Sequence, residues 1–531
     1  MKIYKFFIII LFVGFSFHSC DEFLDEQNPN SITDNSFWKS EDDFTKGLMA
    51  TYQDLQANYV MGGGTATDGH VLSDIVTPNP WGSSQLELHN HYVSDVNSYV
   101  TDKWYQLYTG IFRANQVLEN LQEADFPESF KTNIEAEARF LRGVFYFWLA
   151  TNYNNGSIIL HKSIPINTEE FYKPLSSREE VYELIIEDLL FAQKNLPEKR
   201  PTSELGRATW GAATAKLGKV YLYEERFDEA RNEFKKIIDS DLYSLTPEIS
   251  WNFDLEHEHN SESIFEINFT IATNPPQSTS RAASIAPQEA GGGRSIEPAY
   301  NFIELCKKDP LDPSDPRNKG QVYSIRALAT ICFKGDGQIF YQRPTLDFPF
   351  IVEQEAHIKK FQNWTWPEER SDGRSGINER VIRLADVYLM YAETVLKTSG
   401  NVEEAIKYIN MVRERSGVLK LNKEEYDVDK LLTHIMRVER PLELFVEGHM
   451  IRWNDLRRWG IVKEVLGELS QIKYRAFPDW LREATPEDLE DPDAEIRVQF
   501  TKAYQNYDPQ EDNFFPIPHQ ELLTNEQLSI N

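Results

Sequence analysis

Two short clusters of acidic and histidine residues are the places in the sequence where metal chemistry would be sought first. Residues 257–259 read His-Glu-His, but no third ligand follows at a useful spacing, so we expect a solvated polar loop. Asp309, Asp312 and Asp315 each precede a proline. This run lacks the glycine and the closing glutamate of a calcium-binding EF-hand loop, so it predicts plain turns. Neither cluster predicts a metal site.

Catalytic and cofactor motifs are missing from the sequence. There is no phosphate-binding GxxxxGK[ST], no dinucleotide-binding GxGxxG, no GxSxG and no HExxH. The chain has 84 acidic residues, but no pair of them stands out as the two carboxylates of a glycosidase. Cys306 and Cys332 are expected to be small buried side chains rather than nucleophiles. We therefore predict a protein that is not an enzyme and needs no cofactor.

The composition is that of a folded globular protein with a strong negative charge. Its 531 residues carry a net charge of −29, which disfavours nucleic-acid binding because such proteins need a basic surface. Three cysteines are too few for a disulfide framework. Aromatic residues make up 13% of the chain, enough to fill a core and still leave some for a binding surface.

The first residues have the pattern of an export signal. Lys2 and Lys5 precede an apolar run over residues 6–17, which is too short to span a bilayer. Cys20 follows Ser19 at the end of this run, where bacterial lipoproteins are cleaved and acylated. We expect a signal peptide over residues 1–19 and a lipid on Cys20 that tethers the protein to a membrane.

Most of the chain has the hydrophobic periodicity of paired helices. Apolar residues recur every three or four positions from Phe44 to Leu55, over 131–150, over 178–195 and from Ile382 to Leu396. An alanine-rich helix over 208–225, followed by a turn and a helix opening with Phe227, is typical of a tetratricopeptide unit. The predicted fold class is therefore mainly α, a degenerate scaffold of helix pairs.

Two long stretches interrupt the helical pattern. Loops this long in a compact protein are usually functional, so binding is expected there. The resulting division is a single unit over 20–531, with its scaffold over roughly 31–60, 100–240 and 376–465, irregular insertions over roughly 61–99 and 243–375, and a C-terminal segment over 466–531.

Short motifs along the whole chain resemble those of the SusD/RagB family of outer-membrane nutrient-binding lipoproteins. They are Phe23–Asp25 after the lipid cysteine, Arg113–Gln116 (RxAN), Glu137–Arg142 (EAxFLR), Gly206–Thr209 (GRAT), Arg383–Glu393 (RxAEVxLxYAE), Asn410–Arg415 (NxVRxR), Glu439–Trp459 (ER…EL..EG…DLRRW) and Phe515–Pro518 followed by Glu521 (PIPxxE). Pro441 departs from this pattern and predicts a break or restart of the helix there. Most of the motif residues are expected to be structural, as arginine–carboxylate pairs and helix contacts.

The resemblance implies a function at the cell surface. A family member would pair with a TonB-dependent, SusC-like transporter of the outer membrane and hand over oligo- or polysaccharide. Its helix pairs would pack on the transporter, and its irregular half would carry the ligand site.

Aromatic residues outside the helical stripes are the candidates for sugar binding, because sugar rings stack on aromatic faces while polar groups bond the hydroxyls. Trp81, Trp364 and Trp366 are the first choices, Asp68 and Arg370 are their nearest polar partners, and Tyr300 and Tyr341 are weaker choices. Trp104 and Trp148 lie on helix faces and are expected in the core.

Two other functions stay open at this point. The cargo could be peptide, with the protein acting as the lid of a RagA-like transporter. Less favoured is a surface glycoside hydrolase.

Overall fold

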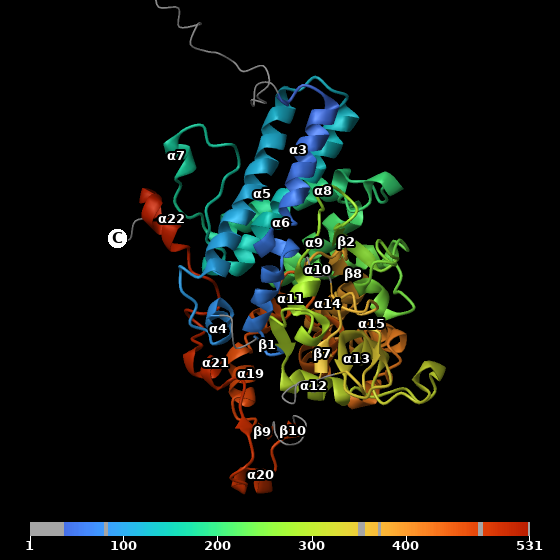
Figure 1. The fold of residues 1–531 in the computed structure, drawn as a ribbon. Coiled ribbons are helices and arrows are strands. Elements are labelled where there is room, and N and C mark those ends of the chain that lie inside the picture. Colours follow the sequence, from blue (N-terminus) through green and yellow to red (C-terminus); the bar gives the residue numbers. More distant parts are fainter. Residues whose placement is uncertain (1–36, 79–82, 349–355, 370–372, 476–481, 529–531) are drawn as a thin grey trace, which may run out of the picture.

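The computed structural model describes residues 37–78, 83–348, 356–369, 373–475 and 482–528 (Figure 1). Long helices form one layer, and short helices and strands cover it. The layer consists of α3 (Glu41–Asp54), α5 (Ser98–Glu123), α6 (Glu128–Asn152), α8 (Arg178–Asn195), α9 (Trp210–Tyr223), α10 (Phe227–Asp239), α14 (Leu384–Thr398) and α15 (Val402–Arg415). The predicted signal peptide and Cys20, the predicted site of lipidation, lie outside the described residues.

Each of these helices packs against the next one in the list, from α3 through to α15. Helix α10 contacts α14 directly, although the long insertion separates them in the chain. This continuous stack confirms the predicted helix-pair scaffold and the mainly α fold. Helix α8 packs against both α6 and α9, so the helix pairs are joined into one unbroken row.

Local signals in the sequence account for the helix ends. The Ser40 hydroxyl accepts a hydrogen bond from the Asp43 amide at 3.3 Å, and the Asp43 carboxylate accepts one from the Ser40 amide at 2.9 Å. This capping box starts α3, as its sequence predicts. Phe44 and Leu48 are then fully buried one turn apart. Trp104 and Trp148 are also in the core, at 1% and 2% exposed.

The periodic pattern from Ile382 extends too far towards the N-terminus. Residues 379–383 form a strand, β8, and α14 begins only at Leu384. Strand β8 pairs antiparallel with β2 (Ser263–Ile267), so hydrogen bonds to β2 hold these residues extended. A short apolar run with buried neighbours fits a strand or a helix equally, and here the partner strand decides.

The irregular part contains small antiparallel sheets and short helices. The other strands are β1 (Val76–Pro78) with β3 (Ile296–Pro298), β4 (Ile331–Phe333) with β7 (Ala356–Ile358), β5 (Ile339–Phe340) with β6 (Arg343–Pro344), and β9 (Tyr474–Arg475) between β10 (Arg482–Glu483) and β11 (Ile496–Arg497). The short helices are α4 (Ser83–His89), α7 (Thr168–Phe171), α11 (Arg281–Ile285), α12 (Tyr300–Lys307), α13 (Ile325–Thr330), α16 (Val428–His434), α17 (Arg440–Glu443), α18 (Ile451–Arg458), α19 (Val462–Leu469), α20 (Pro486–Glu490), α21 (Thr501–Asn506) and α22 (His519–Thr524).

Pro441 lies at a change of helix type, but the predicted break or restart of the helix is absent. Residues 435–439 form a π-helical turn that continues α16 directly, and α17 follows at once with Pro441 in its first turn. The backbone on both sides of the π-turn keeps right-handed helical angles, so the helix runs through this point.

Buried ion pairs tie the irregular part to the helical layer. The Arg383 guanidinium contacts Glu262 and Glu443 at 2.6 Å and Glu447 at 2.7 Å. Arg415 also pairs with Glu262 and Glu443. Burial alone would raise the pKa of Glu262, but Arg415 and Arg383 outweigh it and bring this pKa to about 2. The motif residues of this cluster, Arg383, Arg415, Glu443 and Glu447, are structural, as expected, because each charge is removed from water and neutralised inside the protein.

The segment 61–99 is irregular without being a surface loop. Residues 58–62 form a π-turn and residues 64–72 form a 3-10 helix. Most of the described residues in these two elements are buried. Val71 and Val76 are fully buried, and Leu72 is 2% exposed. Among the described residues, no helix is both long and apolar enough to cross a membrane.

Candidate functional site

A cleft of about 220 Å³ lies between the 3-10 helix Ile249–Phe253 and the segment that follows β7. Trp251, Trp364 and Trp366 all line it, and all three indoles are half-buried. The two segments are more than a hundred positions apart in the chain, so the fold itself assembles this group. We call it the tryptophan cleft.

Trp251 is held in place by a stacked imidazole, which a neighbouring carboxylate orients in turn. The His257 imidazole lies parallel to the Trp251 indole, with ring centroids 4.2 Å apart and an interplanar angle of 4°. Asp254 orients this imidazole, since its carboxylate lies 2.9 Å from Nδ1. One face of Trp251 is thus covered by His257, and the residue lines the cleft.

Trp364 sits on a braced turn. Its carbonyl accepts a hydrogen bond from the Tyr341 amide at 2.8 Å, and the Lys359 ammonium lies 4.1 Å from the centre of its ring. Burial lowers the pKa of Lys359. The Trp366 amide donates to the Asn363 carbonyl at 2.9 Å, which turns the chain so that both tryptophans border the same cleft.

The polar floor of the cleft is built from buried amides. Gln362 and Asn363 are 3% and 4% exposed and line the cleft beside the rings. The Asn363 side chain donates to Glu369 at 2.5 Å, and the Tyr341 hydroxyl donates to Gln362 and Glu369 at 2.9 and 3.0 Å. Aromatic faces with fixed polar groups beside them are suited to a flat ligand that carries hydroxyl groups.

A second hollow contains Asp68. Gly63, Gly64, Asp68 and Gln85 line it together with α11. The Gln85 side chain donates to the Asp68 carboxylate at 2.7 Å. Burial raises the pKa of Asp68 to about 7, against the opposing effects of Gln85 and Lys103. A Cβ atom on Gly64 would lie 2.5 Å from Ser284, so only glycine lets the backbone approach α11 this closely.

Helix α11 lies between the tryptophan cleft and the Asp68 hollow. Its Ser284 lines the hollow, while the carbonyl of Ile285 is 3.4 Å from the Gln362 amide under the cleft. Gly373 also approaches α11, because a Cβ atom there would meet Ala283 at 3.9 Å. The two hollows are therefore neighbours on the irregular part of the protein.

Two family models match the sequence. One, described as the SusD family, matches residues 353–531, and the other, described as starch-binding and associating with the outer membrane, matches residues 22–222. Both matches agree with the fold. The chain belongs to the SusD family.

Relatives of this SusD-family protein are similar over nearly its whole length. SusD-like protein P25 of Formosa agariphila is 27% identical, over 98% of this chain and 97% of its own. The crystal structure of a SusD superfamily protein from Bacteroides vulgatus is 29% identical and superimposes with a TM-score of 0.76, covering 92% of this chain and 98% of its own. A SusD-like carbohydrate-binding protein from Bacteroides fragilis is 22% identical, with a TM-score of 0.77 and coverage of 93% and 100%, and shares the fold.

The residues predicted from the sequence fall into three groups in this SusD-family fold. Trp364 and Trp366 border the tryptophan cleft, and Asp68 lines the neighbouring hollow. Trp81 and Arg370 lie outside the described residues. Tyr341 is 1% exposed, and its amide is hydrogen-bonded to the Trp364 carbonyl. Tyr300 is 4% exposed and stacks on Tyr474, with ring centroids 5.0 Å apart. Neither tyrosine offers a free ring face, because each ring is packed into a small core.

The two polar clusters differ from expectation in part. Residues 257–259 are half-buried, so the prediction of a solvated loop is wrong: His257 stacks on Trp251, and partial burial raises the pKa of Glu258 to about 7. Asp309 is buried and pairs with Arg326 at 2.7 Å. Asp312 and Asp315 do cap turns, by accepting from the amides of Ser314 and Arg317. Within the described ranges, no group of three His, Cys, Asp or Glu could hold a metal ion.

Trp251 and Lys359 are the cleft residues that sequence reasoning missed. Trp251 follows the predicted helices in an irregular stretch, as Trp364 does, so the same criterion could have selected it. Nothing in the sequence indicated Lys359, because its position over the Trp364 ring depends on how the turn after β7 folds. Cys306 and Cys332 are buried, at 0% and 1% exposed, as predicted.

Proposed function

We propose that this SusD-family protein is a cell-surface lipoprotein that captures oligo- or polysaccharide in the tryptophan cleft and delivers it to a SusC-like, TonB-dependent transporter. The observation that carries the proposal is the convergence of Trp251, Trp364 and Trp366 on one cleft with a polar floor. Each indole can cover the C–H face of a sugar ring. The internal hydrogen bonds of Gln362 and Asn363 hold the turn that presents Trp364 and Trp366.

The comparisons support the ligand class and the location. A family model that matches the first part of the chain is described as starch-binding and associating with the outer membrane, and a neighbour with the same fold is described as carbohydrate-binding. Lipidation at Cys20 would supply the membrane tether without a spanning helix. The exposed outer side of the helical layer would remain free for the transporter.

We propose binding without cleavage. The cleft brings together aromatic rings, amides, Lys359 and the carboxylates of Asp254 and Glu256. The Asp254 carboxylate is engaged by the His257 amide and imidazole, which favours a structural role over that of a hydrolytic acid or base. Release of reducing sugar from a bound polymer, abolished by replacing Asp254 or Glu256 of the cleft, would show a hydrolase instead.

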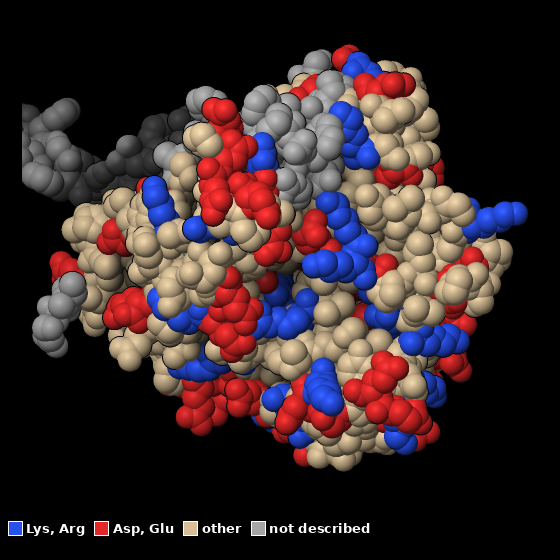
Figure 2. All heavy atoms as spheres, turned by 90° about the horizontal axis from the view of Figure 1, so that it is seen from below, with Lys and Arg blue, Asp and Glu red and all other residues tan. Residues whose placement is uncertain are grey.

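The proposed ligand is a neutral rather than an acidic glycan. A net charge of −29 repels an anionic chain at long range. The charge is uneven, however, and Figure 2 shows basic side chains gathered around a hollow on the face seen from below. Binding of a sulfated or uronic polymer that weakens with added salt would show that such local charge outweighs the overall field.

A glycan array with peptide mixtures alongside tests the ligand class. The expected result is retention of one family of neutral glycans and no retention of peptides. Peptide binding in the absence of glycan binding would favour the lid of a RagA-like transporter. Copurification of the transporter with the tagged lipoprotein, from detergent-solubilised outer membranes, tests the partner separately.

A further inference from the structure

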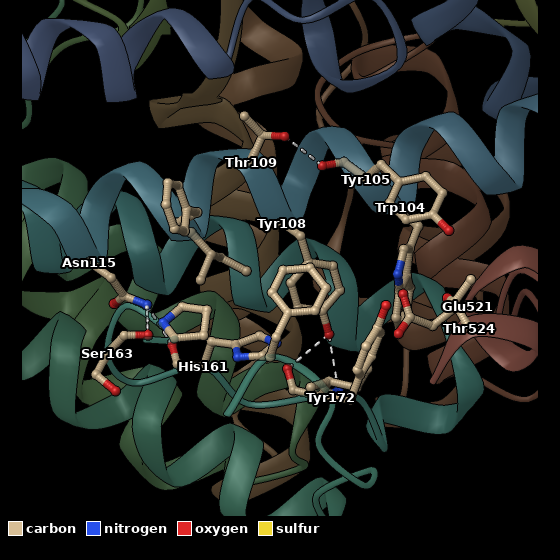
Figure 3. A pocket seen from close by; sticks show the side chains of 15 residues that line it. Trp104, Tyr105, Tyr108, Thr109, Asn115, His161, Ser163, Tyr172, Glu521 and Thr524 are labelled. Atoms are coloured by element: carbon tan, nitrogen blue, oxygen red, sulfur yellow. Dashed lines mark hydrogen bonds between the residues drawn. The ribbon is translucent and has the colours of Figure 1, made fainter. Parts of the chain in front are cut away.

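A third cavity lies apart from the two hollows described above. Its residues come in part from α7 and α22, on the left of Figure 1, whereas the tryptophan cleft is lined from α13 and the residues after β7, on the right. It occupies about 320 Å³ between α5, the segment 159–172 and α22, near the lower end of the range for small-molecule pockets (Figure 3). None of its lining residues borders the tryptophan cleft. It is called the α5 pocket below.

Aromatic rings make up most of the α5 pocket. Tyr105 and Phe112 from α5 are 37% and 41% exposed, and Phe171 from α7 is 56% exposed. Tyr108, Tyr172 and Trp104 complete the group, and Figure 3 shows Tyr108 at its centre. Ring faces left open in a cavity are costly in water, so they indicate a surface that something covers.

The Tyr108 hydroxyl and the Asn115 amide of the wall are bonded within the protein. The Tyr108 hydroxyl donates to the Ile159 carbonyl at 2.8 Å and accepts from its amide at 3.0 Å. The Asn115 side chain donates to the His161 carbonyl at 2.8 Å. These bonds attach the segment 159–163 to α5, so the rings are held in position before any ligand arrives.

Glu521 is the only charged residue among the described residues that line the α5 pocket. Its carboxylate accepts from the Asn525 side chain at 3.3 Å, and no Lys or Arg of the described chain pairs with it. Its negative charge acts on the Tyr105 ring. Burial is the main cause that raises the pKa of Tyr105, and the charge of Glu521 raises it further. His161 adds no positive charge, since burial and Lys173 lower its pKa to about 4.

We propose that the α5 pocket binds a compact organic cation, a protonated or quaternary amine, between its tyrosine rings and the Glu521 carboxylate. The negative faces of aromatic rings attract ammonium groups, and a single carboxylate without a basic partner supplies the counter-charge. Neutral sugars would gain the same apolar contact but nothing from Glu521. The acidic protein as a whole also attracts cations.

Choline is a suitable probe, with its neutral carbon isostere, in which a quaternary carbon replaces the nitrogen, as the matched ligand. Binding to the full mature chain would be followed by ligand-observed NMR titration, with maltose as a neutral sugar. We expect saturable binding of choline in the millimolar range and binding of the isostere that is at least about fivefold weaker.

Two variants locate the site. Glu521→Gln should weaken choline binding about fivefold while leaving the isostere unchanged, and Tyr105→Ala should weaken both. Glu526→Gln removes the same charge close by in sequence, outside the pocket lining, and should have little effect. Because Glu521 and Tyr105 are partly exposed, both variants should fold, which a thermal melt checks.

Equal binding of choline and its isostere would overturn the proposal, as would tighter binding of maltose or a loss of affinity in Glu526→Gln that matches Glu521→Gln. Absence of saturable choline binding would overturn it as well. Each of these outcomes leaves glycan capture at the tryptophan cleft unaffected.

Discussion

The imidazole of His257 lies flat against the indole of Trp251, with the ring centroids 4.2 Å apart. This contact turns a tryptophan of an irregular segment into a fixed wall of the tryptophan cleft. The Asp254 carboxylate holds the edge of this imidazole, at 2.9 Å from Nδ1. A ligand that stacks on Trp251 therefore meets a ring whose orientation is already set, which lowers the entropy lost on binding.

Removing the indoles of the tryptophan cleft should abolish most glycan binding. We expect Trp251→Ala, and the double change Trp364→Ala/Trp366→Ala, each to weaken binding about tenfold or more, since an aromatic contact contributes about 0.5–1.5 kcal/mol beyond its buried area. Calorimetric titration with the glycan found on the array measures this.

The matched control is Tyr92→Ala, which removes a 53% exposed aromatic ring that does not line the cleft. Its affinity should equal that of the wild type, and thermal melts of all variants should agree closely. Unchanged affinity in both tryptophan variants would assign these rings to packing, and would leave Trp81 as the remaining predicted tryptophan.

Glycan affinity should depend on pH through Asp68 if the hollow beside α11 takes part in binding. The pKa of Asp68 is about 7, so its charged form increases as the pH rises through neutrality. A sugar hydroxyl donates more strongly to the charged carboxylate, so affinity should rise from about pH 6 to about pH 8.

Asp68→Asn should remove this pH dependence and leave an affinity close to that of the protonated wild type. Glycan titrations of the wild type and Asp68→Asn at the two pH values, with Trp81→Ala measured in parallel, test whether Asp68 causes the pH dependence. The same slope in wild type and Asp68→Asn would place the hollow outside the ligand site.

The buried cluster around Arg383 should make the fold sensitive to acid. The pKa of Glu262 is about 2 in the folded protein and about 4.5 ordinarily, so its contribution to stability is complete above about pH 4.5. That contribution is lost as the pH falls from there towards 2, because the unfolded state then binds the proton more readily. Chemical denaturation at a series of pH values measures the slope.

Glu262→Gln should lower the free energy of unfolding at pH 7 by about 3–5 kcal/mol, because it leaves Arg383 and Arg415 buried beside an uncharged group. Its stability should also change less between about pH 4.5 and 2. Glu424→Gln, at an exposed position, is the matched control and should change the stability little. Equal stability of the two variants would contradict the structural role assigned to this cluster.

Cys20→Ser should release the protein from the outer membrane. Residues 6–17 are too short to span it, so a lipid on Cys20 is the expected anchor. Fractionation should be done in a strain without the transporter, which could otherwise retain the protein. Persistence of the variant in the membrane fraction of that strain would disprove lipidation at this residue.

Sequence reasoning succeeded where interactions are local or recur along the chain. The capping box at Ser40 involves neighbours three positions apart, and the helix faces repeat every three or four residues. The arginine and carboxylate motifs predicted that buried ion pairs would form, but they did not predict which residues would pair. Arg383 contacts Glu262, which lies outside every family motif.

Tertiary structure alone decided which aromatic residues can meet a ligand. Trp364, Tyr341 and Tyr300 occupy similar irregular sequence, yet the first borders a cleft while the tyrosines pack into cores. Trp251 joins Trp364 only because β2 and β8 pair and draw the insertion back onto the helical layer. The α5 pocket likewise needs α22, from the end of the chain, to bring Glu521 to α5. The sequence by itself determined the helices and the family, since periodicity and motifs are properties of short segments. Burial and convergence depend on packing between segments far apart in the chain, and only the folded structure reveals them.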